Sequence, residues 1–293
     1  MARRETDKKR LKKSRRSGEV FYRFMRNKTA VIGLVILILI VMVAVFADLI
    51  VDEQVALQQN DAEMKLPPQK GHIFGTDTLG RDYFARVVHG SRMSILVGIL
   101  TTIGIMTIGC VLGSIAAYYG GIVDTIITRS VDTIMCIPAT LLSLTVVAAF
   151  GPNFRNLIIA MVVAYVPTTI RFVRGVVLTI TEQDYIEAAK AYGATNTRII
   201  FKYILPNAFG PIMVDSTQAV GGVILTASGL SYLGMGVQPP DPEWGALLSS
   251  AGDQFREAPY LILFPGLAIV LTAFAINLVG DGLRDALDPK LRD

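Results

Sequence analysis

The sequence predicts an all-α protein that crosses a membrane several times. Its residues are 52% hydrophobic, with a mean hydropathy of +0.50. Only 18% of them are charged, against about 25% in a typical soluble domain. The apolar residues form long unbroken runs, and none of these runs alternates with polar residues as membrane β-barrel strands do. Together these observations exclude a disordered chain, a disulfide-stapled secreted domain and an ordinary cytosolic enzyme.

The first apolar run, residues 30–47, contains 18 residues and no charge. As a helix it would be about 27 Å long, close to the ~30 Å thickness of a hydrocarbon core. A soluble helix would carry a polar face, and this run has none. The run also exceeds the ~7–15 apolar residues of a cleaved signal peptide. We therefore expect an uncleaved transmembrane helix.

Five further apolar runs predict five more transmembrane helices, which gives six in all. They cover residues 95–118, 134–150, 157–170, 209–230 and 261–279. In the second run, Gly109 and Gly113 form a G-x-x-x-G pair, which lets two helices approach closely. Pro138 lies in the first turns of the third run and predicts a kink there.

Positive charge is concentrated at the N-terminus. Residues 1–28 hold 12 Lys or Arg against three acidic residues, about +9, whereas the whole chain carries +4. Such segments favour the cytoplasmic side of a membrane, so both termini of a six-helix chain are expected in the cytoplasm. In that orientation 21 of the 28 Lys and Arg are cytoplasmic. Nucleic-acid binding is the alternative for a basic run; we expect the lipid bilayer, and no nucleic acid, as its partner.

The segment of about 35 residues between the fourth and fifth runs is patterned as two short helices. Thr181 and Asp184 have the spacing of a capping box. One apolar face of the first helix then repeats at helical spacing. It consists of Tyr185, Ala188, Ala189 and Tyr192. Gly193 is placed to end this helix.

The second short helix is expected to start at Thr195 or Asn196 and to run through Ile204, where Pro206 would stop it. The small residues of the first helix make a slim surface that a groove in another protein can approach. Glu187 and Lys190 can pair with each other or with a partner. The alternative is an amphipathic loop helix that lies on the membrane.

These residues resemble the EAA signature of permease subunits of binding-protein-dependent ABC importers. The resemblance rests on Glu187-Ala188-Ala189, on Gly193 and on Leu205-Pro206, all at the spacing of that signature. The family pattern usually has Ile two residues before the Leu, and this chain has Tyr203 there.

Further motifs resemble the dipeptide, oligopeptide and nickel permease group, and within it the C-type partner subunit. They are Asn27-Lys28-Thr29-Ala30, Phe74-Gly75-Thr76-Asp77, Gly80-Arg81-Asp82, Gly90-Ser91-Arg92, Ser231-Tyr232-Leu233-Gly234, Pro239-Pro240 and Trp244-Gly245. The resemblance covers roughly residues 26–290.

The resemblance implies the type I ABC importer permease fold, with six transmembrane helices and a cytoplasmic loop that carries the coupling helix. The expected organisation is a basic cytoplasmic tail over residues 1–28, and a first transmembrane helix with an extracytoplasmic loop over residues 29–92. The transmembrane core would follow over residues 93–285, with the EAA loop near 181–206, and then a cytoplasmic tail over 286–293.

The family also implies a division of labour among several proteins. Two permease subunits, usually different, form the pathway in the cell membrane. Two cytoplasmic ATPase subunits dock on the coupling helices, and an external binding protein delivers a peptide-like substrate. The residues expected to contact the ATPase are Glu187, Ala188, Ala189, Gly193, Leu205 and Pro206.

The chain itself is expected to be a transport subunit and no enzyme. It lacks the G-x-x-x-x-G-K-[ST] phosphate loop, and it shows no catalytic triad and no zinc-ligand spacing. No catalytic residue, cofactor or metal is therefore expected. Two alternatives stay open within transport: a nickel or other small-solute importer of the same group, and an ion-gradient-driven secondary transporter. A membrane scaffold or receptor without transport is the third.

Three polar residues lie inside apolar runs and are candidates for the substrate pathway. They are Asp215, Gln218 and Asn277. Polar side chains are costly against lipid, so each is expected to face protein or a wet cavity. Hydrogen bonding between helices, or nearness to the cytoplasmic interface, is the competing interpretation.

Overall fold

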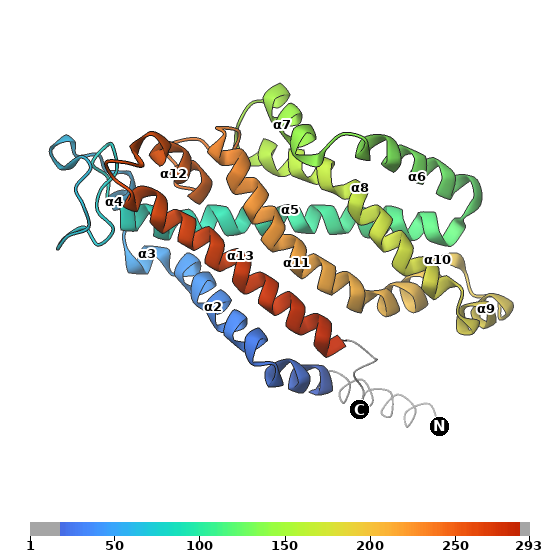
Figure 1. The fold of residues 1–293 in the computed structure, drawn as a ribbon. Helices are drawn as coiled ribbons and strands as arrows, with labels where there is room; N and C mark the ends of the chain where they lie inside the picture. The colour runs from blue at the N-terminus through green and yellow to red at the C-terminus, as the bar shows by residue number, and fades with distance from the viewer. Residues whose placement is uncertain (1–17, 288–293) are drawn as a thin grey trace.

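A computed structural model describes residues 18–287 of the chain. Most of the basic tail expected over residues 1–28, and most of the C-terminal tail expected over 286–293, lie outside the described residues. Over the described range the fold is helical, and residues 18–26 form a short helix before the first span. The long helices lie side by side in an elongated bundle (Figure 1).

The expected runs 95–118, 157–170, 209–230 and 261–279 lie within longer helices, whereas the runs 30–47 and 134–150 are each divided between two helices. The helix bounds are α2 Lys28–Val45, α3 Ala47–Ile50, α4 Glu53–Leu57, η1 Asp61–Glu63, α5 Tyr83–Tyr119, α6 Gly121–Met135, α7 Ala139–Phe150, α8 Phe154–Thr181, α9 Asp184–Ala191, α10 Asn196–Ile199, η2 Ile200–Ile204, α11 Leu205–Tyr232, α12 Trp244–Ala251, η3 Gly252–Gln254 and α13 Tyr260–Leu287.

Over residues 18–287, five helices are long and apolar enough to cross a membrane, and a bent pair of helices makes a sixth, broken span if the pair is counted as one. The broken span consists of α6 and α7, which are bent by 83° relative to each other. The bend includes Pro138, the N-cap residue of α7, so the expected kink is confirmed. With only 12 residues, α7 is about 18 Å long, too short to cross ~30 Å of hydrocarbon alone.

Helix α6 was missed by the sequence analysis, because most of its residues lie between the second and third apolar runs. Its sequence mixes apolar residues with Asp124, Arg129 and Asp132, so hydropathy gives no transmembrane signal. Similarly, α8 continues 11 residues beyond the fourth apolar run. Hydropathy marks the part of a helix that faces lipid, and a helix that pairs its charges with a neighbour extends further.

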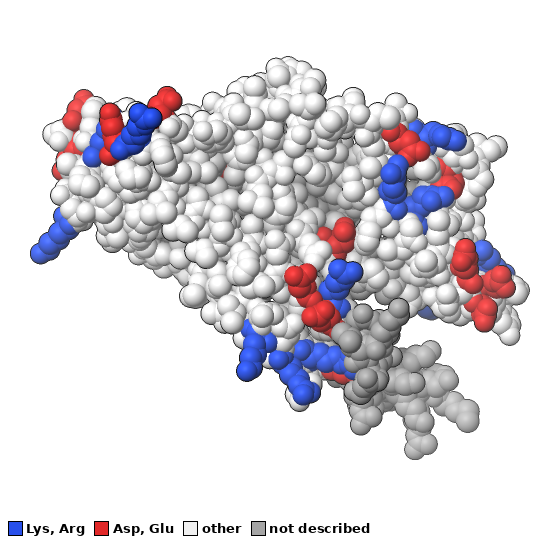
Figure 2. All heavy atoms as spheres, in the orientation of Figure 1, with Lys and Arg blue, Asp and Glu red and all other residues white. Residues whose placement is uncertain are grey.

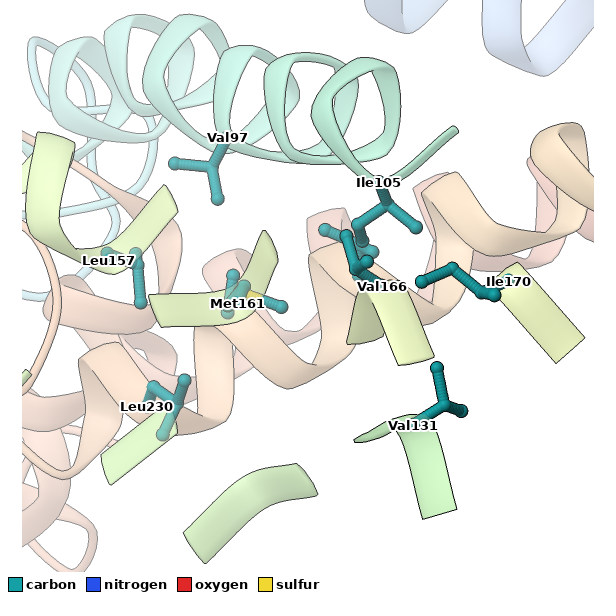
Figure 3. Close-up of a cluster of buried hydrophobic side chains, with 10 residues drawn as sticks. Val97, Ile105, Val131, Leu157, Met161, Val166, Ile170 and Leu230 are labelled. Atoms are coloured by element: carbon teal, nitrogen blue, oxygen red, sulfur yellow. The ribbon is translucent and has the colours of Figure 1, made fainter. Parts of the chain in front are cut away.

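The centre of the bundle is an apolar cluster between α5, α8 and α11. Val97, Ile105, Met161, Ile170 and Leu230 are all buried in it (Figure 3). On the same side of α5, a side-chain carbon at Gly109 would collide with Thr169, and one at Gly113 would lie 2.8 Å from the carbonyl oxygen of Ile170. The expected close approach at the G-x-x-x-G pair is thus confirmed.

On the visible face, charged side chains gather at the left end, at the right end and at the lower centre, and a broad uncharged surface separates the left group from the other two (Figure 2). One end holds buried charged side chains of the loop before α5 and of the first turn of α5, where the Nε of Arg86 lies 3.5 Å from the Oδ2 of Asp77. There the Nε of Arg81 lies 2.7 Å from the Oδ2 of Asp77, and Arg86 donates to the carbonyl oxygen of Ala56 at 3.1 Å. Asp77, a motif residue of the dipeptide permease group, and Arg86, which lies outside the quoted motifs, therefore hold the loop and α4 onto α5.

The end of α2 is fixed to α5 by Arg92. Its Nε donates to the carbonyl oxygen of Ala44 at 2.6 Å, and its guanidinium binds both oxygens of Asp48 at 2.9 and 2.8 Å. The hydrogen bonds from Arg92 hold the pKa of the Asp48 carboxyl below its ordinary value. A cation suits this position because the last carbonyl groups of a helix lack partners within the helix.

The packing of α2 on α13 yields the first prediction. A Cβ on Gly33 would lie 2.5 Å from the Cβ of Leu278 and 2.9 Å from the carbonyl oxygen of Ala275. Gly33→Leu should therefore push the two helices apart and destabilise the chain by about 1–3 kcal/mol. The measurement is the midpoint of thermal unfolding of the purified chain in detergent.

The matched control for this prediction is Gly266→Leu on α13, where a Cβ would meet nothing within 4 Å. Its unfolding midpoint should equal that of the unmodified chain. Equal midpoints for the two variants would show that α2 and α13 are not in close contact at Gly33.

Candidate functional site

The EAA loop lies at the end of the molecule opposite the ion-paired loops (Figure 1). Its first helix, α9, begins at Asp184, and two residues separate it from the end of α8 at Thr181. The expected capping box at Thr181 is wrong, because Thr181 is still helical and its hydroxyl donates to the carbonyl oxygen of Leu178 at 2.9 Å. Gln183 is the N-cap residue of α9, and its side chain makes no capping hydrogen bond.

The end of α9 is set by Gly193, as expected. Gly193 has φ of +74°, a conformation that is costly for residues with a Cβ. Its N–H donates to the carbonyl oxygen of Lys190 at 2.9 Å, and the N–H of Ala194 donates to that of Ala189 at 3.0 Å. This pair of bonds is a Schellman motif, which reverses the chain tightly.

The second half of the loop starts at Thr195, one of the two expected starts. Its hydroxyl oxygen accepts from the N–H of Arg198 at 3.4 Å. The expectation that Pro206 stops this helix is wrong. The π-turn of η2 leads directly into α11, and the N–H of Leu205 reaches back five residues to the carbonyl oxygen of Ile200. Pro206 lies in the first turn of α11, where an N–H needs no partner within the helix. Together with the wider π-turn before it, this position lets the chain continue as a helix through the proline.

The inner side of the loop is seated on the bundle by three isoleucines. Ile186, Ile199 and Ile204 are fully buried. They pack against residues from the ends of α5, α8 and α11, namely Ala117, Val173, Val177, Ala208 and Ile212. Tyr203, at the position where the family pattern has Ile, packs partly buried against the same cluster. The loop is therefore held rigidly against three long helices.

The four residues of the expected apolar face of α9 do not all face the same way. One faces the bundle and three face away from it. Ala189 is partly buried beside Ile186, a residue outside that expected face. The other members face away from the bundle: Tyr185 is 42% exposed, Tyr192 is 91% exposed, and Ala188 is exposed. Nothing in the described chain covers these side chains, so α9 presents small and aromatic residues outward.

The charges on α9 do not pair with each other. Glu187 is exposed, and the Nζ of Lys190 lies 5.6 Å from the ring centroid of Tyr118 at the end of α5. The hydroxyl of Tyr118 also donates to Asn196 at 2.8 Å. Tyr118 thus joins both halves of the loop to α5. The sequence analysis missed it because it ends an apolar run like any other aromatic residue.

The six residues of the EAA signature lie within the loop and the first turn of α11. Glu187, Ala188, Gly193 and Pro206 are exposed, and Ala189 and Leu205 are partly buried. Among the described residues no group of three His, Cys, Asp or Glu side chains is arranged to hold a metal ion. The EAA loop therefore has an exposed outer surface, and its inner side packs against α5, α8 and α11.

The three candidate pathway residues lie on α11 and α13. The Nε2 of Gln218 donates to Asp281 at 2.8 Å, and the Oδ1 of Asn277 lies beside Gly221. Asp215 is partly buried and has no hydrogen-bond or ion-pair partner among the described residues. The bond to Asp281, which the sequence analysis overlooked, favours the helix-to-helix interpretation for Gln218. A pathway role stays a prediction for all three.

Comparison with known proteins identifies the family. Residues 109–293 match the model of the inner membrane component of binding-protein-dependent transport systems. Residues 16–68 match the N-terminal transmembrane domain of oligopeptide transport permease C.

Several named proteins are similar over nearly the whole chain. The dipeptide transport system permease protein DppC of Alkalihalophilus pseudofirmus is 42% identical, covering 94% of this chain and 90% of that protein. DppC of Escherichia coli is 43% identical, covering 94% and 93%. The glutathione transport system permease protein GsiD of Pectobacterium atrosepticum is 40% identical, covering 94% and 91%.

These matches agree with the helical membrane bundle and with the exposed, rigidly seated EAA loop. The chain belongs to the family of inner-membrane permease components of binding-protein-dependent ABC importers.

Proposed function

We propose that this chain forms, with a second and different permease subunit, the membrane pathway of an ATP-driven importer of short peptides. The observation that carries the proposal is the construction of α9. Its inner residue Ile186 is fully buried, while Tyr185 and Tyr192 on its outer side are exposed. Exposed aromatic and small residues on a rigid support are typical of a protein-docking surface.

The outer side of α9 is proposed to bind one cytoplasmic ATPase subunit. ATP binding draws two ATPases together, and the loop moves with its ATPase. Because α9 follows α8 after two residues and η2 continues into α11, this movement reaches two spans without a flexible link. Differential binding energy then shifts the bundle between inward- and outward-facing forms.

The substrate is proposed to be a di- or oligopeptide delivered by an external binding protein. Relatives named as dipeptide and glutathione permeases, at 40–43% identity over most of the chain, favour a peptide-like substrate over nickel or another small solute. A secondary transporter is disfavoured because such a role offers no use for the exposed face of α9.

The proposal is tested by purifying the protein from its native membranes in mild detergent. ATPase subunits and a second permease should copurify with it. In proteoliposomes this assembly, supplied with ATP and the binding protein, should take up labelled dipeptide in preference to nickel ions. Uptake that follows an imposed ion gradient and ignores ATP would overturn the proposal.

The turn after α9 yields a prediction about ATPase docking. Gly193→Trp should abolish uptake and reduce copurification of the ATPases, with the chain still in the membrane at a normal level. The reasons are a backbone strain of roughly 1 kcal/mol at positive φ and a bulky side chain that holds the ATPase away. The measurement is ATPase copurification at matched membrane levels.

Gly193→Asn is the matched control, because Asn tolerates positive φ better than other residues with a side chain and is much smaller than Trp. It should retain most of the docking. Normal docking and uptake by the Trp variant would mean that residues 181–206 are only a surface loop.

The proposed orientation, with both termini and the EAA loop in the cytoplasm, yields a prediction about chemical labelling. In a chain without Cys110 and Cys136, Lys190→Cys should react with a membrane-impermeant thiol reagent only after the cells are permeabilised. The reason is the excess of Lys and Arg on that side. Lys65→Cys, in the loops at the opposite end, is the control and should react in intact spheroplasts. Ready labelling of residue 190 in intact spheroplasts would reverse the proposed topology.

The position of Asp215 yields a prediction about uptake. Ten residues separate it from Leu205, so it lies about 15 Å along α11 from the EAA loop, where water can reach it. Asp215→Asn keeps the size of the side chain and should change uptake by no more than about twofold. Uptake is measured at matched membrane levels. A fall to background with normal ATPase docking would instead place Asp215 on the substrate path.

A further inference from the structure

Helix α6 is attached to the bundle by little apolar packing. Within the described chain, Val131 is the only one of its 15 residues that is buried. Ile122 and Ile126 are 79% and 62% exposed. A cavity of about 290 Å³ lies between α6 and α8. The residues that line it are Thr128, Val131, Asp132, Ile170, Arg171 and Arg174.

Among the described residues, two ion pairs join α6 to α8 beside this cavity. The guanidinium of Arg174 donates to both oxygens of Asp124 at 2.5 Å, and Thr128 donates to the same carboxylate at 3.0 Å. Arg171 pairs with Asp132. The bidentate pair is the more sheltered one, with side chains 28% and 20% exposed against 53% and 39%. Two parallel bonds fix the relative orientation of both groups.

These pairs stand between the EAA loop and the broken span. Arg174 lies seven residues before the end of α8 at Thr181, about two helical turns, and α9 follows directly. On the other side, Asp124 lies in the first turn of α6, which leads through the 83° bend into α7. A movement of α9 therefore reaches α8 directly, and these side chains join α8 to α6, in addition to the chain connection from α5 to α6.

We propose that the Arg174–Asp124 pair, supported by Arg171–Asp132, is a strut that makes α6 move with α8 and so carries movement of the EAA loop to the broken span. This inference rests on the proposed function. Arg174 and Asp124 are positioning residues that stay joined through the transport cycle. Separating them would leave Arg174 without its ion-pair partner and Asp124 with only the bond from Thr128, and the apolar packing of α6 is limited to residues such as Val131 and Ile127.

The strut is tested by the ratio of substrate imported to ATP hydrolysed, in proteoliposomes that contain the whole transporter and its binding protein. Arg174→Gln should lower this ratio about tenfold, within the range of ordinary coupling energies, while the binding protein still stimulates ATP hydrolysis. The reversed pair, Arg174→Asp with Asp124→Arg, should restore most of the ratio. Arg129→Gln is the matched control on α6, because it removes the same charge from an exposed position, and it should leave the ratio unchanged.

A covalent link in place of the ion pair tests whether residues 124 and 174 stay joined during transport or must separate in each cycle. In a chain without Cys110 and Cys136, Asp124→Cys with Arg174→Cys should have a low ratio. Joining the two thiols with a short, cleavable bifunctional reagent should raise it, and cleavage should lower it again. A normal ratio for Arg174→Gln, or inhibition of uptake by the cross-link, would overturn the inference.

A distance measurement tests the strut independently of transport. Spin labels on Ile126→Cys and Thr179→Cys should show a broader distance distribution in the Arg174→Gln background than in the Arg129→Gln background. Equal distributions would overturn the strut. If the unmodified assembly shows no ATP-dependent uptake, the proposed function fails, and this distance measurement still decides the inference.

Discussion

Every backbone N–H and C=O group that lies in hydrocarbon must find a partner inside the protein, and this requirement decides where the chain can depart from regular helix. Two departures in the described part of the chain have such partners. At the end of α2, Arg92 covers the free carbonyl oxygens of Ala44 and Val45. Before Pro206, which has no N–H, the chain widens into a π-turn closed by a bond from Leu205 to Ile200. Both sites lie at helix ends, where the expected loops begin.

The sequence predicted the features that depend on contact with lipid or on local geometry. Six spans with a kink at Pro138 in the third, and the end of α9 at Gly193, were expected on those grounds. The structure has five continuous helices of this kind, the bend at Pro138 and the end at Gly193. It did not predict α6, because a helix whose Asp124 pairs with Arg174 on a distant segment looks like a polar connection in hydropathy. Nor did it predict that Ile186 would seat the EAA loop, because burial against three other helices is a tertiary property. The spacing of Tyr185, Ala188, Ala189 and Tyr192 identified a surface, but it could not tell which part would face outward.

Helix α5 connects the two ends of the molecule that carry recognisable motifs. With 37 residues it is about 55 Å long, well beyond the thickness of the hydrocarbon core. Near its start, Arg86 and Arg92 hold the loops and the end of α2. At its other end, Tyr118 contacts both halves of the EAA loop. Along the middle, the close approach at Gly109 and Gly113 fixes α5 to α8. The proposed docking surface on α9 and the loops at the opposite end of the molecule are thus attached to one continuous helix.

The burial of Trp244 gives the molecule a built-in optical reporter. It is the only tryptophan of the chain, it is 2% exposed, and its indole N–H donates to the carbonyl oxygen of Val87 on α5 at 2.9 Å. Its ring also lies against Gly90, where a Cβ would come within 3.2 Å. All tryptophan emission from this subunit therefore originates where α12 meets α5. A shift of its wavelength reports a change of solvation at that junction alone, without any dye attached.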